Sequence, residues 1–234
     1  MTPRRRLAFA LDYPTLADAR RGAEAVCASA GVLKIGLELF VREGPAALRI
    51  GRELDCDVFL DLKLHDIPET VDRAVGSAIE HGVRYLTVHG VGGPRMLEQA
   101  ARRAEGSGIT LLAVTVLTSL DAADLRAVGV SDPPAEQARR VARLAFDHGV
   151  RGFVCSPAEV GALRAELGDS AVLVTPGIRP GGGAGDDQKR TGRPGATIRA
   201  GSSVLVVGRP IRDAADPAAV AAAIVQEIAD ASHD

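Results

Sequence analysis

The sequence predicts an α/β protein and, within that class, a closed (β/α)8 TIM barrel. Three observations indicate this fold: eight short apolar segments recur at intervals of roughly 20 to 40 residues, an amphipathic stretch follows each one, and no linker interrupts the alternation. An open doubly wound sheet fits less well, because no Gly-x-Gly-x-x-Gly turn follows the first segment. With 234 residues and 46% hydrophobic content, the chain can bury one substantial core, so we expect residues 1–234 to form a single domain.

The eight apolar segments are the expected strands. A short apolar run bounded by turn residues is typical of a buried strand. The segments are Leu7–Leu11, Val32–Gly36, Val58–Lys63, Tyr85–His89, Thr110–Val116, Gly152–Cys155, Ala171–Thr175 and Ser203–Gly208. In a barrel of this kind, the C-terminal ends of the strands converge on one mouth, and the active site is expected there.

Helices are expected between the strands, where start and stop signals occur. Thr15 with Asp18 resembles a capping box, and Asp216 before Pro217 caps the last helix. Proline marks four further starts, at Gly44-Pro45, Pro68, Gly93-Pro94 and Ser156-Pro157. Glycine closes helices at Gly31, Gly82, Gly108, Gly149 and Gly168.

Charge and composition argue against several classes of function. A net charge of −2 and a pI near 6.2 provide no overall electrostatic attraction for nucleic acid or an anionic membrane. No run approaches a membrane span, and the apolar stretch after the basic start is too short for a signal-peptide core. Cys27, Cys56 and Cys155 lack a CxxC spacing, so we expect free thiols in a reducing cytoplasm and no zinc site.

The end of the third expected strand carries the most informative charges. Asp61 and Lys63 are two residues apart, so in a strand they project to one face, and Asp66 follows in the turn. Such groups are costly to bury unless they pair or do chemistry. Of 28 basic residues only three are lysines, and Lys34 and Lys63 both fall in expected strands. Because an ammonium can be tuned to release its proton, this favours proton transfer or point-charge stabilisation, with a structural ion pair as the alternative.

Polar residues also stand at the ends of other expected strands. Asp12, Lys34, Asp61 and Lys63 would alternate in charge around the mouth, which keeps each group ionised and fixed in place. His89 also lies at the mouth, but no second His or Cys stands at ligand spacing from it, so we expect no metal. Later strands run into Thr118-Ser119, Thr175–Arg179 and Gly208-Arg209.

The segment from Gly181 to Arg190 is glycine-rich and too long for a simple connection, and we interpret it as a lid. Barrels commonly bind phosphate in the loops after the seventh and eighth strands. Here those loops supply Gln188, the backbone near Gly208 and the guanidinium of Arg209. The alternative is a disordered surface loop with one exposed arginine.

Seven motifs together resemble orotidine 5′-monophosphate decarboxylase. They are Leu11–Asp12, Leu33–Gly36, Asp61–Thr70, Leu117–Ser119, Thr175–Pro180, Asp187–Gln188 and Val207–Pro210. An Asp-x-Lys-x-x-Asp motif alone is shared by a wider group of barrel decarboxylases and sugar-phosphate synthases, whereas the ordered set over nearly the whole chain is specific. The resemblance implies decarboxylation of orotidine 5′-monophosphate to uridine 5′-monophosphate in pyrimidine biosynthesis, without a cofactor, in the cytoplasm.

The resemblance also implies roles for the charged residues. Lys63 resembles the lysine that protonates the pyrimidine C6 carbanion, and Asp61 the carboxylate that faces the departing carboxylate. Asp66 resembles the acid that each chain of a homodimer contributes to its partner's site, where it touches the ribose. Asp12 and Lys34 resemble the other ribose and charge-network residues.

The remaining implied contacts are with the base and the phosphate. Thr118 resembles a substrate-contacting residue in the loop after the fifth strand. The phosphate-binding set is implied to be Arg179, Gln188, Gly208 and Arg209, and the matched motifs add Ile67, Thr70 and Pro180 as substrate contacts. Glu69 departs from the amide residue expected in many members, and Gly181–Gly183 is richer in glycine than usual.

Two other functions remain open from the sequence. The first is a metal-dependent decarboxylase or synthase of sugar phosphates from the same barrel group. Those enzymes resemble this chain at Asp61, Lys63 and Asp66 but carry a metal-binding Glu where Lys34 aligns, and an ammonium there would repel Mg²⁺. The second is a barrel that binds a phosphorylated ligand without catalysis, which would bury the charged groups at a cost without using them.

Overall fold

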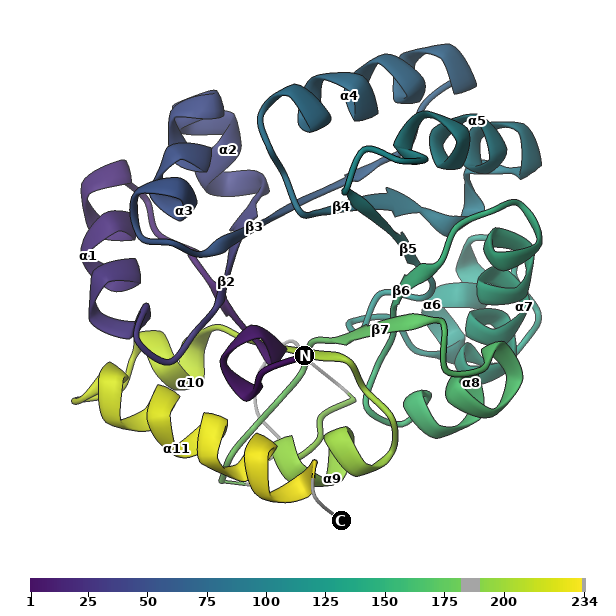
Figure 1. Cartoon of the computed structure of the whole chain (residues 1–234). Coiled ribbons are helices and arrows are strands. Elements are labelled where there is room, and N and C mark those ends of the chain that lie inside the picture. Colours follow the sequence, from purple (N-terminus) through teal and green to yellow (C-terminus); the bar gives the residue numbers. More distant parts are fainter. Residues whose placement is uncertain (182–189, 233–234) are drawn as a thin grey trace.

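Eight parallel strands close into a barrel in the computed structural model, which describes residues 1–181 and 190–232 (Figure 1). Each strand pairs with the next, and β8 returns to β1. The strands are β1 (Leu7–Ala10), β2 (Val32–Gly36), β3 (Asp57–Leu64), β4 (Tyr85–His89), β5 (Thr110–Val114), β6 (Gly152–Val154), β7 (Val172–Thr175) and β8 (Val204–Val207). The predicted TIM barrel and its eight strands are confirmed, with ends that differ by one or two residues, as is usual where a strand becomes a loop.

The helices form a ring outside the strands (Figure 1). They are α1 (Leu16–Val26), α2 (Leu37–Glu43), α3 (Arg49–Glu53), α4 (Pro68–Glu80), α5 (Pro94–Ala104), α6 (Ala122–Ala127), α7 (Pro134–Asp147), α8 (Val160–Leu167), α9 (Pro194–Arg199), α10 (Arg209–Arg212) and α11 (Pro217–Ala231). The predicted caps at Thr15 and Asp216 are confirmed, because each side chain accepts a backbone N–H from the first turn.

Two predicted helix starts were imprecise. Gly44-Pro45 opens a short 3-10 turn, η2 (Gly44–Leu48), that leads into α3. Ser156-Pro157 does not open α8 directly, because the helix begins only at Val160. There, the carboxylate of Glu159 accepts the Ser156 N–H (2.8 Å) and holds a turn ahead of the helix.

The core consists of two apolar layers on either side of the barrel wall. Along β1, the side chains of Leu7 and Phe9 pack outward against the helices, whereas Ala8 and Ala10 pack inside the barrel, as the alternation of a strand requires. Leu112 is fully buried in the inner layer. Because the interior is filled, the barrel is a packed core whose free space lies at its mouth.

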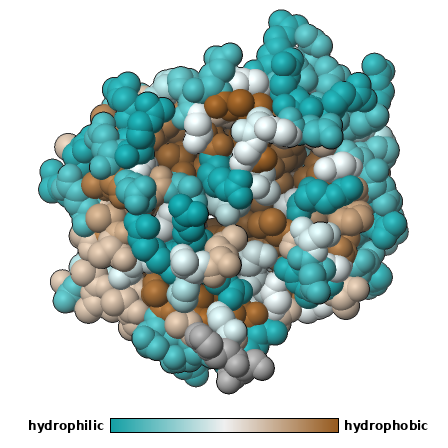
Figure 2. All heavy atoms as spheres, viewed as in Figure 1, coloured by the Kyte–Doolittle hydropathy of each residue, from teal (hydrophilic) through white to brown (hydrophobic). Residues whose placement is uncertain are grey.

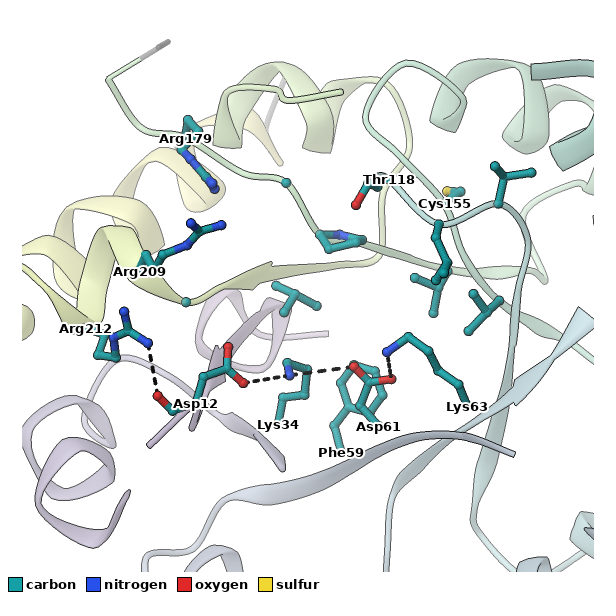
Figure 3. Close-up of a pocket in the computed structure, with 18 residues that line it drawn as sticks. Asp12, Lys34, Phe59, Asp61, Lys63, Thr118, Cys155, Arg179, Arg209 and Arg212 are labelled. Atoms are coloured by element: carbon teal, nitrogen blue, oxygen red, sulfur yellow. Dashed lines mark hydrogen bonds and ion pairs between the residues drawn. The ribbon is translucent and has the colours of Figure 1, made fainter. Parts of the chain in front are cut away.

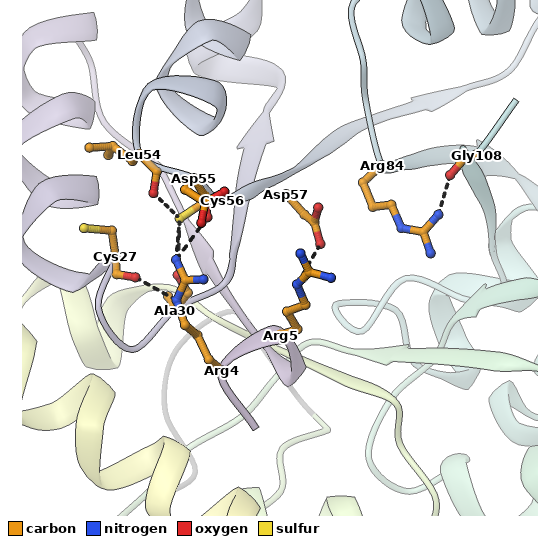
Figure 4. Close-up of polar contacts among 10 residues, drawn as sticks. All are labelled: Arg4, Arg5, Cys27, Ala30, Leu54, Asp55, Cys56, Asp57, Arg84 and Gly108. Carbon is orange, nitrogen blue, oxygen red and sulfur yellow. Dashed lines mark hydrogen bonds and ion pairs between the residues drawn. The ribbon is translucent and has the colours of Figure 1, made fainter. Parts of the chain in front are cut away.

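The basic start of the chain fastens the end of the barrel opposite the mouth. Residues of the 3-10 turn η1 (Pro3–Arg6) precede β1, and Figure 4 shows Arg4 between two loops that join helices to strands. Its guanidinium donates hydrogen bonds to the carbonyl oxygens of Cys27 (3.0 Å) and Asp55 (3.1 Å). The arginine therefore ties the loops before β2 and β3 together.

Arg6 joins the first strand to the last part of the chain. Its guanidinium donates to the carbonyl oxygens of Ser202 (2.6 Å) and Ser203 (3.2 Å), just before β8. It also donates to the hydroxyl of Ser232 (2.7 Å), at the end of α11. The seam between β8 and β1 is thus closed by side-chain bonds as well as by the strand ladder.

Hydrophilic side chains gather on the upper right of Figure 2, where α4 and α5 lie. Between these two helices, the buried carboxylate of Asp72 on α4 accepts hydrogen bonds from Arg103 on α5. Among residues 1–181 and 190–232, no helix is both long and apolar enough to cross a membrane. Cys27, Cys56 and Cys155 are free thiols.

We predict that Leu112→Ala lowers the free energy of unfolding by about 2–5 kcal/mol, because the truncated side chain leaves a cavity inside the packed barrel. Val128→Ala is the control, since that side chain is 73% exposed and its loss should change stability by no more than about 0.5 kcal/mol. Urea unfolding followed by circular dichroism measures both. Equal stability of the two variants would contradict the packed interior.

Candidate active site

Four charged side chains form a row across the mouth of the barrel, in the order Asp12, Lys34, Asp61 and Lys63 (Figure 3). Lys34 Nζ lies 3.3 Å from Asp12 Oδ1 and 3.6 Å from Asp61 Oδ2. Lys63 Nζ lies 2.8 Å from Asp61 Oδ1. The strands β1, β2 and β3 are neighbours, so Asp12, just after β1, and the side chains of β2 and β3 come together as the alternating charges that the sequence predicted.

Asp61 is the centre of this row because it lies between both lysines. Burial alone would raise the pKa of its carboxyl group, but the charges of Lys34 and Lys63, with hydrogen bonds from Lys63 and Thr87, hold that pKa below its ordinary value. The carboxylate therefore stays ionised at neutral pH. It is also fixed in direction, since both of its oxygens face an ammonium.

Lys63 reaches the mouth through an irregular backbone rather than through a regular strand. Its φ angle is +51°, a left-handed conformation that costs energy for a residue with a side chain. The register between β3 and β4 shifts between Leu60 and Leu64, as in a β-bulge, which re-aims a side chain. The simple two-residue alternation was thus an incomplete reason for the approach of Lys63 to Asp61.

Thr87 holds this bulge in place, although the sequence motifs did not include it. The threonine is fully buried on β4. Its hydroxyl accepts the backbone N–H of Lys63 (2.8 Å) and donates to Asp61 Oδ1 (3.0 Å). A polar residue inside the apolar run Tyr85–His89 was the available signal, because a buried hydroxyl needs partners.

A cavity of about 350 Å³ opens beside the charged row. Figure 3 shows Asp61 and Lys63 at one end of it and Arg179, Arg209 and Arg212 at the other. One end therefore offers an ammonium beside a carboxylate, and the other offers guanidinium groups that suit a phosphate.

The arginine-lined end contains a further residue that the sequence did not indicate. Arg212 on α10 donates a hydrogen bond to the backbone carbonyl of Asp12 (3.0 Å) and pairs with Asp213. It therefore fixes the start of the charged row from the far side. Gly208 lies next to it in the cavity wall, where an added Cβ would come within 3.3 Å of Ala10 and 3.5 Å of Asp12.

Thr118 and Cys155 line the cavity from the loops after β5 and β6. Burial raises the pKa of the Cys155 thiol to about 12, so this sulfur is protonated and not nucleophilic at neutral pH. Gln188 and most of the predicted lid lie outside the described residues. Pro180 follows Arg179 but is not in the cavity wall.

Three residues of the central motif lie outside the cavity wall of their own chain. Asp66, Ile67 and Thr70 are exposed and do not line it. The carboxylate of Asp66 accepts the Ile67 N–H (2.6 Å) at the start of α4. Within one chain, the structure therefore does not bring these predicted site residues together with Lys63.

His89 lies at the end of β4, with its ring stacked on His65 at 5.3 Å between centroids. Burial lowers the pKa of His89, and nearby His65 and Lys63 lower it further, so the imidazole is neutral at physiological pH. In the part of the chain that the structure describes, no group of three or more His, Cys, Asp or Glu side chains could hold a metal ion.

Comparisons with known proteins agree on one family. The model of the "Orotidine 5′-phosphate decarboxylase / HUMPS family" matches residues 5–224. A protein of Anaeromyxobacter sp. (strain K) named orotidine 5′-phosphate decarboxylase is 55% identical, with 96% of this chain and 98% of the relative covered. One from Chromohalobacter salexigens with the same name is 50% identical, with 97% of each chain covered.

Solved structures with a similar fold include a protein of the same name. The crystal structure of orotidine 5′-phosphate decarboxylase from Lactobacillus acidophilus superposes with a TM-score of 0.84 at 34% identity, covering 96% of this chain and 99% of that one. An uncharacterized conserved protein from Geobacillus kaustophilus gives a TM-score of 0.82 at 32% identity, covering 95% and 99%.

We predict that Thr87→Val raises the pKa of Asp61, because it removes a hydrogen bond that favours the ionised carboxyl. It also leaves the Lys63 N–H without its acceptor, which should lower the free energy of unfolding by about 1–3 kcal/mol. The pKa is measured from the carboxyl carbon resonance in an NMR pH titration. Thr87→Ser keeps the hydroxyl and should change both quantities less.

Thr115→Val is the matched control for this prediction. Thr115 is also buried, but its hydroxyl donates to the carbonyl of Val154 (2.9 Å) and does not contact the charged row. The control should leave the pKa of Asp61 unchanged. A Thr87→Val protein that titrates like the control would remove Thr87 from the site.

Proposed function

Because this chain belongs to the orotidine 5′-phosphate decarboxylase / HUMPS family, we propose that it is a carboxy-lyase that converts orotidine 5′-monophosphate to uridine 5′-monophosphate in pyrimidine biosynthesis. The observation that carries the proposal is the row Asp12–Lys34–Asp61–Lys63 beside a cavity whose other end is lined by arginines. The cytoplasm, where the precursor would be made, is the proposed location.

The proposed chemistry starts with the breaking of the bond between C6 of the pyrimidine and its carboxylate. CO2 leaves, and the electron pair of that bond remains on C6 as a carbanion. In the absence of a cofactor that could accept these electrons, a preorganised positive charge must stabilise them. The ammonium of Lys63 supplies that charge and then its proton, which forms the new C6–H bond; the resulting amine takes a proton back from solvent.

Asp61 has two proposed parts in this step. Its carboxylate holds the Lys63 ammonium at 2.8 Å, which keeps the proton donor charged until the carbanion forms. It also faces the carboxylate that leaves as CO2. Lys34 offsets the resulting concentration of negative charge from the other side, at 3.6 Å from Asp61, and with Asp12 it is the proposed contact for the ribose.

The arginine-lined end is proposed to bind the 5′-phosphate. Arg179 and Arg209 supply planar guanidinium groups suited to phosphate oxygens, and the backbone at Gly208 and the side chain of Gln188 complete the proposed set. Thr118 and Pro180 are proposed contacts on the same substrate. Phosphate binding is remote from the reacting carbon, so its energy accelerates the reaction only by ordering the charged row around the base.

We infer that the working form is a homodimer in which Asp66 completes the partner's site. Asp66, Ile67 and Thr70 are exposed at the end of β3. Large apolar side chains are exposed close to this turn in the sequence or at the adjacent ends of β2 and β4: Leu37 (53%), Val41 (80%), Ile67 (66%) and Val91 (46%). Such a gathering at one rim favours a two-fold contact between identical faces.

We predict that the purified protein consumes orotidine 5′-monophosphate, followed by its loss of absorbance, and that a chelator does not change the rate. Lys63→Ala should lower kcat on the order of 10³-fold or more, because the ammonium acts on charge that develops during the reaction. Its affinity for uridine 5′-monophosphate should change less than about tenfold, since the phosphate contacts remain. Stable absorbance with the unmodified protein would refute the activity, and near-normal turnover of Lys63→Ala would refute the proton donor.

A mixing experiment tests the shared site. Lys63→Ala and Asp66→Ala chains, each nearly inactive alone, are combined in equal amounts and allowed to exchange. In a mixed dimer, one site combines the intact Lys63 of one chain with the intact Asp66 of the other. About half of the dimers are mixed, so activity should return to about a quarter of the unmodified value per chain. If Asp66 acted within its own chain, mixing would restore nothing.

A further inference from the structure

Glu159 and Arg190 form a buried ion pair near the mouth that the proposed chemistry does not use. Glu159 lies in the turn between β6 and α8, and one carboxylate oxygen pairs with the guanidinium of Arg190. The other oxygen accepts the Ser156 N–H (2.8 Å). Only 3% of the Glu159 side chain and 17% of the Arg190 side chain are exposed. Burying two charged groups costs desolvation free energy, so a buried ion pair is weak evidence for a role in stability alone.

Arg190 extends from this pair to the loop that carries Thr118. Its second terminal nitrogen donates hydrogen bonds to the carbonyl oxygens of Val116 (3.2 Å) and Leu117 (3.0 Å). Val116, Leu117 and Thr118 all line the cavity. One guanidinium therefore joins the loop after β6 to the loop after β5.

Two residues further along, the backbone reaches the segment that carries Arg179. Gly192 accepts the Arg179 N–H (2.8 Å), and its own N–H donates to the carbonyl of Gly177 (3.1 Å). An added Cβ at Gly192 would lie 2.5 Å from Pro157 in the loop after β6, so this residue must stay small. The segment 190–192 is thus packed where the loops after β5, β6 and β7 meet.

We propose that Arg190, held by Glu159, is a positioning residue that sets the place of Arg179 relative to Thr118. It contacts no reacting atom itself, and the inference rests on the proposed function, in which Arg179 meets the phosphate and Thr118 is a further contact on the same substrate. A guanidinium suits this task because its planar fork can bond a carboxylate and two carbonyls at once. A lysine ammonium carries all of its donors on one atom and so lacks the two separate terminal nitrogens that Arg190 uses here.

The first test measures kcat/KM for orotidine 5′-monophosphate. Arg190→Gln should lower it on the order of 10- to 100-fold, because a displacement of about 1 Å at a site costs that much. Arg190→Lys should lose most of the same factor, and it provides a second variant if the first does not fold. Arg139→Gln is the matched control, since Arg139 pairs with Glu166 on the protein surface and should change kcat/KM less than about twofold.

The second test asks whether Arg190 acts through Arg179. Arg190→Gln is combined with Arg179→Ala, and the losses in kcat/KM are compared with those of the single variants. If Arg190 positions Arg179, the losses overlap and the double variant is better than the product of the two factors. Independent, fully multiplied losses would overturn the inference, because a general structural role would produce them.

The third test does not depend on the reaction. Amide hydrogen exchange at Arg179 and Gly192 reports the two backbone bonds described above, and it should be faster in Arg190→Gln than in the unmodified protein or in Arg139→Gln. If the unmodified protein fails to consume orotidine 5′-monophosphate, the proposed function is refuted while exchange still tests the positioning role. Unchanged exchange in Arg190→Gln would overturn that role whatever the assay gives.

Discussion

The interaction on which the site depends is the attraction of two ammonium groups to one buried carboxylate. Without Lys34 and Lys63, the desolvation of Asp61 would favour its neutral form, and the row would lose the charges that define it. Three adjacent strands, β1 to β3, hold the groups at 2.8 to 3.6 Å. The closed barrel fixes these strands relative to one another, and the loops around the mouth add the other side chains of the cavity wall.

Much of the architecture follows from local patterns in the sequence. Buried parallel strands appear as short apolar runs, so the eight strands were found within one or two residues. The charged row was also predictable, because Asp12 follows the first strand, and Lys34 and Asp61 lie in the two strands next to it. Seven short motifs then identified the family, which the comparisons over nearly the whole chain confirm.

The sequence did not reveal the side chains that support the site but lie far from its residues along the chain. Thr87 is 24 residues from Lys63 and 26 from Asp61 along the chain, and Arg190 is 73 residues from Leu117. The hydrophobic periodicity of a sequence carries no information about polar contacts between residues so far apart. The left-handed backbone at Lys63 was equally hidden, since it departs from the strand geometry that its apolar neighbours indicate and is stabilised by a hydroxyl from the next strand.

The seam between β8 and β1 brings the first strand of the chain beside the last. Arg6 bonds to Ser202 and Ser232, which are 196 and 226 residues away, so the contacts that close the ring have nearly the largest loop entropy the chain can present. During synthesis, β1 can pair with β2 as soon as both are made, but its other edge can be covered only after β8 has been made. Asp12 follows β1 and Arg209 follows β8, so the two flank this seam. The phosphate end of the site is therefore the part that a growing chain completes last.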